Sequence, residues 1–143
     1  MADQIISKRP TFVPDHHDDR PLSPHLQIWG WTITMASSIA QRATGIALYA
    51  GSLLFVAWLT AAALGEEAFN FINGILGSPL GLIILIGFTW AQMFHMSKGI
   101  LHLVWDGGHL LSKGQGKKAA TVVFAMSALL TIIIWAVALG LGG

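Results

Sequence analysis

Residues 79–105 read PLGLIILIGFTWAQMFHMSKGILHLVW, and this stretch decides the fold. It is long enough to cross a bilayer as one helix, because a membrane span needs about 20 mainly apolar residues. Its second half also contains His95, Lys98 and His102. Ionisable side chains are costly in hydrocarbon and usually have a function there. The stretch therefore predicts a membrane helix that carries chemistry in its second half.

The composition of the whole chain indicates a membrane protein. Hydrophobic residues make up 54% of the 143 residues and charged residues only 10%, against about 25% charged residues in soluble domains. The chain has no cysteine, which excludes disulfides, cysteine-ligated iron–sulfur clusters and thiolate zinc sites within it. The net charge of +1 does not indicate a nucleic-acid partner.

Two further apolar blocks predict an all-α integral membrane protein with three transmembrane helices. The spans are expected at about 32–64, 79–105 and 119–141, within a membrane domain of residues 28–143. Residues 1–27 are a polar arm without the apolar core of a cleaved signal peptide. The spans are joined by EEAFNFINGILGS and by SKGQGKK (112–118), which is expected to be a short polar loop.

The basic side chains indicate the orientation of the spans. Apart from Lys98 within the second span, they lie in the arm, at the start of the first span and in the second connection, at Lys8, Arg9, Arg20, Arg42, Lys113, Lys117 and Lys118. The first connection has two glutamates and no basic residue. Because cytoplasmic loops are enriched in lysine and arginine, the N-terminus is expected in the cytoplasm and the C-terminus outside.

One face of the second span carries several polar residues. Helical residues turn by about 100° each, so His95 and His102 share a face and lie about 10 Å apart along the axis. Gly99 lies between them, and Asp106 continues the row. A neutral imidazole can ligate haem iron, and a neighbouring glycine leaves room for the flat porphyrin. Histidines hydrogen-bonded to another helix explain the pattern equally well.

A second polar pair occurs where the first span begins. In SSIAQRATG (37–45), Ser38 and Arg42 are four residues apart and share a helix face at the expected membrane surface. A hydroxyl and a guanidinium there suit the carbonyl oxygens of a lipid-soluble quinone. The alternative is structural, with Arg42 at the lipid headgroups and Ser38 bonded to its own backbone.

Three segments together resemble a known family. RPLSPHLQIW (20–29), SSIAQRATG (37–45) and HMSKGILHLVWDGG (95–108) are similar, in order and spacing, to the cytochrome b subunit of succinate dehydrogenase, respiratory complex II. That family has an R-P-x-S-P-H-L segment, then S-x-x-H-R-x-[ST]-G at the first of three spans, then H-x(3)-G-x-x-H-x(3)-D in the second. The resemblance covers residues 20–108.

The resemblance implies a role for individual residues. His95 matches the axial ligand of haem b, and His102 matches a histidine near the haem propionates. Ser38 and Arg42 match the serine and arginine of the ubiquinone site, with Arg42 also close to the propionates. Asp106 matches a carboxylate near the quinone.

One position departs from the family pattern. Gln41 stands where the family usually has a histidine beside a haem propionate. A glutamine can donate a hydrogen bond but carries no charge. At this position a propionate would therefore meet an uncharged hydrogen-bond donor instead of a histidine, whereas the axial ligand His95 is unchanged.

The resemblance also implies an assembly in the lipid bilayer. A second membrane anchor subunit would supply the other axial histidine, and the iron–sulfur and flavoprotein subunits would dock on the cytoplasmic side. Electrons from succinate would then reach ubiquinone in a bacterial inner membrane, with the C-terminus periplasmic. The alternatives are a haem-free anchor, a quinol:fumarate reductase anchor, and a small transporter or proton relay that uses the row of His95, His102 and Asp106.

Overall fold

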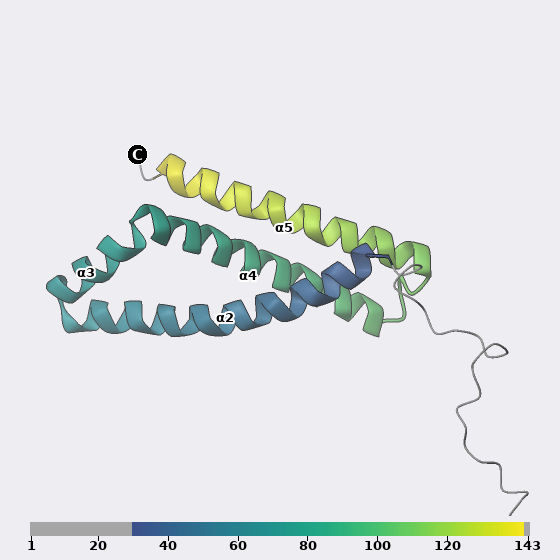
Figure 1. Ribbon diagram of the computed structural model, residues 1–143, viewed down its shortest axis with the longest axis horizontal. Coiled ribbons are helices and arrows are strands. Elements are labelled where there is room, and N and C mark those ends of the chain that lie inside the picture. The colour runs from purple at the N-terminus through teal and green to yellow at the C-terminus, as the bar shows by residue number, and fades with distance from the viewer. Residues whose placement is uncertain (1–29, 142–143) are drawn as a thin grey trace, which may run out of the picture. The chain divides into compact units, whose positions relative to one another are not determined.

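The computed structural model describes residues 30–141, and most of them are helical. The helices are α2 (Ile33–Leu64), α3 (Glu66–Leu76), α4 (Pro79–Asp106) and α5 (Lys113–Leu141) (Figure 1). α2, α4 and α5 are each long and apolar enough to cross a membrane. The predicted all-α class with three spans is confirmed, whereas the predicted N-terminal arm lies outside the described residues.

The three long helices run in alternating directions. α4 packs against both α2 and α5, and α2 also contacts α5. The start of α2, the end of α4 and the start of α5 therefore share one end of the bundle, and α3 lies at the other end (Figure 1). Arg42 and the lysines at the start of α5 belong to the first end, and Glu66 and Glu67 to the second.

A small core lies where the three long helices meet. Phe94 of α4 is fully buried, and its ring centre lies 4.8 Å from that of Phe124 on α5. Leu101 and Val123 belong to the same cluster. Most other large apolar side chains are exposed, as expected for helices that gain little by leaving a lipid solvent. The core fixes how the helices cross and leaves much apolar surface for lipid or partner chains.

The first connection contains a helix that hydropathy did not predict. α3 begins after Gly65, whose φ of +117° lies in the region that favours glycine. Glu66 and Glu67 occupy its first turn, where negative charge is favoured by the helix dipole. Trp58 Nε1 on α2 donates a hydrogen bond of 3.0 Å to Asn73 Oδ1 on α3. This bond ties α3 to the end of α2.

The start of α5 also differs from the expectation. The prediction of a polar loop over residues 112–118 is wrong, because Ser112 caps a helix that begins at Lys113. The backbone N–H of Gln115 donates to Ser112 Oγ at 3.4 Å, and the N–H of Ser112 donates to Gln115 Oε1 at 3.3 Å. This reciprocal capping box satisfies two backbone donors at the helix start.

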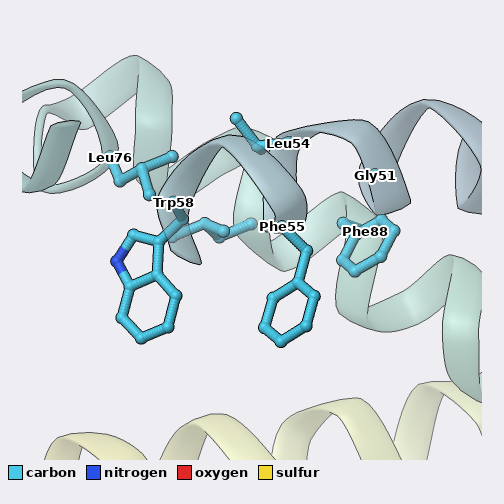
Figure 2. A pocket seen from close by; sticks show the side chains of 7 residues that line it. Gly51, Leu54, Phe55, Trp58, Leu76 and Phe88 are labelled. Atoms are coloured by element: carbon cyan, nitrogen blue, oxygen red, sulfur yellow. The ribbon is translucent and has the colours of Figure 1, made fainter. Parts of the chain in front are cut away.

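An apolar cavity of about 290 Å³ lies between α2, α4 and the end of α3. Its lining is Gly51, Leu54, Phe55, Trp58, Leu76, Leu85 and Phe88. Figure 2 shows the Phe55 and Trp58 rings pointing to the same side of α2, with the Phe88 ring against α2 at Gly51. A Cβ atom at Gly51 would overlap that ring. The glycine therefore permits α2 and α4 to approach closely.

Gly81 makes a similar approach to the backbone at the end of α3. A Cβ atom there would overlap the carbonyl oxygens of Ile75 and Leu76. We expect Gly81→Ala to lower the free energy of unfolding by about 1–3 kcal/mol, the usual cost of overpacking. Thermal melting of the purified complex measures this. Gly87→Ala is the control, because its added methyl group meets nothing within 4 Å; equal melting of the two variants would contradict the prediction.

Candidate functional site

His95 on α4 lies against α2, where the two helices cross. Its ring is half-buried, with Nδ1 3.3 Å from Thr44 Oγ1 and Nε2 3.4 Å from Gln41 Nε2. Thr44 is only 3% exposed. The structure thus brings His95 into contact with the SSIAQRATG segment, which the sequence had singled out for a different reason.

The hydrogen bonds around His95 agree on one form of the imidazole. The Thr44 hydroxyl donates to the Ala40 carbonyl at 2.8 Å, so its oxygen is free to accept from Nδ1–H of His95. The Gln41 amide nitrogen is a donor only, so Nε2 of His95 accepts from it. The contacts therefore favour the neutral tautomer with the proton on Nδ1 and the lone pair on Nε2.

Gly45 lets α2 approach the edge of the same ring. A Cβ atom at Gly45 would lie 3.3 Å from His95 Cε1, which is closer than side chains usually pack. Sequence reasoning missed Thr44 and Gly45 as site residues. A signal was present, because small residues permit close helix contacts in membranes, but the pattern of one helix does not show which neighbour its face meets.

The other predicted site residues lie on the surface of the described structure. Among the predicted site residues, the exposed side chains are those of Ser38, Arg42, His102 and Asp106. None of them makes a side-chain hydrogen bond or ion pair with residues 30–141, although the His102 ring contacts Trp105, with 5.4 Å between centres. A Cβ atom at Gly99 would meet only open space. These residues are therefore accessible to a ligand or a partner chain.

Because α2 and α4 are antiparallel, the predicted site residues on the two helices can be compared by their position along the bundle axis. Gln41 and His95 are in contact, so residues before Gln41 on α2 and after His95 on α4 extend toward the same end. Ser38 and Asp106 therefore lie toward one end of the bundle, which is the end that carries the basic residues (Figure 1).

The family assignment comes from comparison with known proteins. A family model described as the succinate dehydrogenase/fumarate reductase transmembrane subunit matches residues 16–134. The chain belongs to this family. Its named relatives are succinate dehydrogenase subunits, so the chain is a membrane anchor subunit of that enzyme and works in a complex with its other subunits. The resemblance noted in the sequence is confirmed.

Individual relatives agree with the family. The chain is 40% identical over 115 residues to the succinate dehydrogenase cytochrome b556 subunit of Paracoccus denitrificans, covering 80% of this chain and 88% of the relative. It is 36% identical over 116 residues to the mitochondrial cytochrome b560 subunit of Bos taurus, covering 80% and 69%. It is 31% identical over 119 residues to the cytochrome b556 subunit of Rickettsia felis, covering 83% and 93%.

Lys98 is a buried cation in this succinate dehydrogenase anchor. It is 4% exposed, and its Nζ lies 4.2 Å from the centre of the Trp105 ring. No carboxylate pairs with it among residues 30–141. A desolvated cation–π contact contributes up to about 2 kcal/mol. Lys98 therefore occupies a different environment from the exposed His102, although both lie in the second half of the same span.

A double-mutant cycle tests whether Trp105 stabilises the buried ammonium. Trp105→Leu is expected to destabilise the native complex more than a complex that already carries Lys98→Met, by about 0.5–2 kcal/mol. The reason is that methionine leaves no cation to stabilise. The four melting curves of the cycle measure the coupling. Purely additive costs would show that the contact contributes nothing.

Proposed function

We propose that this subunit binds haem b and ubiquinone and passes electrons from the iron–sulfur subunit to ubiquinone. The observation that carries the proposal is the arrangement around His95, whose contacts with α2 favour a lone pair on Nε2. A deprotonated ring nitrogen is what metal ligation requires. The printed names of the relatives, cytochrome b556 and b560 subunits, support haem b as the group bound.

The residues around His95 fit a haem. His95 offers a ligand nitrogen, and Gly99 borders open space one turn away along α4. Gln41 Oε1 is buried and has no hydrogen-bond partner among residues 30–141, so this oxygen can still accept a hydrogen bond from a ligand or a partner chain. His102 and Arg42 are exposed donors suited to anionic propionates. A bound haem supplies one-electron transfer, and the residues of the chain hold it and shape its surroundings.

The second axial ligand is assigned to a partner. Within residues 30–141, no three histidine, cysteine, aspartate or glutamate side chains gather as a metal site. A haem needs fewer ligands from this chain, since His95 can bind one face of the iron. A histidine from a second membrane anchor subunit would complete the coordination.

The quinone site is proposed at Ser38, Arg42 and Asp106. These polar side chains are exposed on otherwise apolar helices, so a lipid-soluble ring can approach them from the membrane. The Ser38 hydroxyl can donate a hydrogen bond to a quinone oxygen. The guanidinium of Arg42 stabilises negative charge that develops on that oxygen during reduction.

The distribution of charge supports an orientation. Arg42 and the lysines at 113–118 lie at one end of the bundle, and Glu66 and Glu67 at the other. The positive-inside rule then assigns the basic end to the cytoplasm and the C-terminus to the periplasm of a bacterial inner membrane. The iron–sulfur and flavoprotein subunits would dock at the basic end, close to the proposed quinone residues.

One alternative within the same family is a haem-free anchor. It is favoured by one observation: both ring nitrogens of His95 are already hydrogen-bonded to α2, as in a packing role. The family description also covers fumarate reductase, but the named relatives are succinate dehydrogenase subunits and do not favour a quinol:fumarate reductase anchor. The proton relay is not favoured, because His95 is half-buried against α2 whereas His102 and Asp106 are exposed.

The axial role of His95 is tested by absorption spectroscopy. His95→Ala, expressed with the other subunits, is expected to abolish the b-type band of the dithionite-reduced complex, because the iron loses one of its two ligands. His109→Ala is the matched control, since His109 is exposed beyond the end of α4. An unchanged band in His95→Ala would favour the haem-free anchor.

The quinone site is tested by separating two activities. Ser38→Ala and Arg42→Ala are expected to lower succinate-driven quinone reduction about 10-fold or more, as loss of a transition-state donor does. Reduction of an artificial dye by the flavoprotein and iron–sulfur subunits should persist. Ser52→Ala, at an exposed serine farther along α2, is the control. Normal quinone reduction in both variants would count against the assignment.

A further inference from the structure

Thr44 is buried at the helix crossing, and its hydroxyl has a fixed arrangement of bonds. Its Oγ1 lies 2.8 Å from the Ala40 carbonyl, 3.1 Å from the Gln41 carbonyl and 3.3 Å from His95 Nδ1. The two carbonyls can only accept, so the single hydroxyl proton belongs to this helix backbone. The contact with His95 then requires a proton on Nδ1.

We infer that Thr44 is the positioning residue for His95: it holds the proton on Nδ1 and so presents Nε2 as the nitrogen that binds iron. This inference rests on the proposed haem-binding function and deepens it. Metal-bound histidines usually donate their second ring N–H to such a partner, which fixes the tautomer and the ring orientation.

Gly45 completes this positioning by sterics. Thr44 and Gly45 are adjacent on α2, and the Gly45 backbone lies beside the Cε1 edge of the imidazole. The hydroxyl fixes one nitrogen, and the bare backbone limits how the ring can rotate about its bond to Cβ. A methyl group at Gly45 would push the ring by a few tenths of an ångström, since its Cβ would lie 3.3 Å from Cε1.

Gln41 gives independent support for the same tautomer. Its amide nitrogen lies 3.4 Å from His95 Nε2 and can only donate. The nitrogen assigned to the iron is therefore the one that already accepts a hydrogen bond in the isolated chain. Iron binding at Nε2 would replace this contact and release the Gln41 amide for other partners.

The Thr44 bond has a measurable consequence for a bound haem. A hydrogen bond accepted from Nδ1–H makes the imidazole a more basic ligand, which favours ferric over ferrous iron. Removing it is expected to raise the midpoint potential. A tenfold loss of preference for the ferric state corresponds to about 59 mV for a one-electron couple. Retention of haem is also expected to weaken by roughly 10–100-fold.

The test compares Thr44→Val, which keeps the shape without the hydroxyl, with Thr44→Ser, which keeps the hydroxyl. Thr60→Val is the matched control, because the Thr60 hydroxyl also bonds to its own helix, to the Val56 carbonyl at 2.8 Å, and Thr60 is exposed far from His95. The complete complex is titrated for haem potential, and the ferric electron paramagnetic resonance signal reports the ring orientation. Haem content is measured after purification.

Thr44→Val is expected to raise the haem potential or to lose haem. Thr44→Ser is expected to restore both, and Thr60→Val to match the native complex. Gly45→Ala is expected to shift the ferric signal with Thr44 intact. If the native complex contains haem and the Thr44→Val complex has the same midpoint potential, ferric signal and haem content, the role of Thr44 is overturned while the haem assignment stands. Failure of Thr44→Ser to restore them also overturns the role of Thr44. A native complex without a b-type band overturns the haem assignment itself.

Discussion

The close contact between α2 and α4 is the constraint on which the rest of the structure depends. Helices in lipid gain little from burying apolar side chains, so they associate through small residues and polar contacts. Gly51 makes room for Phe88, and Gly45 makes room for His95, at two heights of the same helix pair. Two fixed contacts set the register of α4 against α2. The position of His95 follows from that register.

Side-chain hydrogen bonds between helices then specify which faces meet. Trp58 bonds to Asn73 on α3 at 3.0 Å, and Trp135 on α5 donates to Thr89 on α4 at 3.3 Å. Such bonds contribute only about 0.6 kcal/mol on average within membranes. Their energy is too small to hold the bundle together, so their main effect is directional. The contact of His95 with Thr44 belongs to the same class, and its direction favours the imidazole tautomer with the proton on Nδ1.

The sequence predicted the spans well because hydropathy reports directly on the solvent of a membrane helix. It missed α3, which is short and begins after Gly65 without a side-chain cap. It also missed the start of α5, which depends on the capping bonds between Ser112 and Gln115 rather than on apolar length. It singled out His95 from helical spacing but not Thr44, because a contact between helices depends on their register. It also did not distinguish Lys98 from His102 in the second half of the same span, although packing buries only Lys98.

The two ends of the bundle differ in how far the chain satisfies its own polar groups. Ser37 Oγ, Gln41 Oε1 and Trp105 Nε1 are buried without hydrogen-bond partners among residues 30–141, and all three lie in the half where α2 begins and α4 ends. In the other half, the indole N–H of Trp58 is satisfied by Asn73 Oδ1. A buried polar group left unpaired costs about 1–3 kcal/mol, and native proteins rarely leave one so. The basic half therefore gains most from groups that lie outside residues 30–141, which is consistent with the proposal that the other subunits dock at this end.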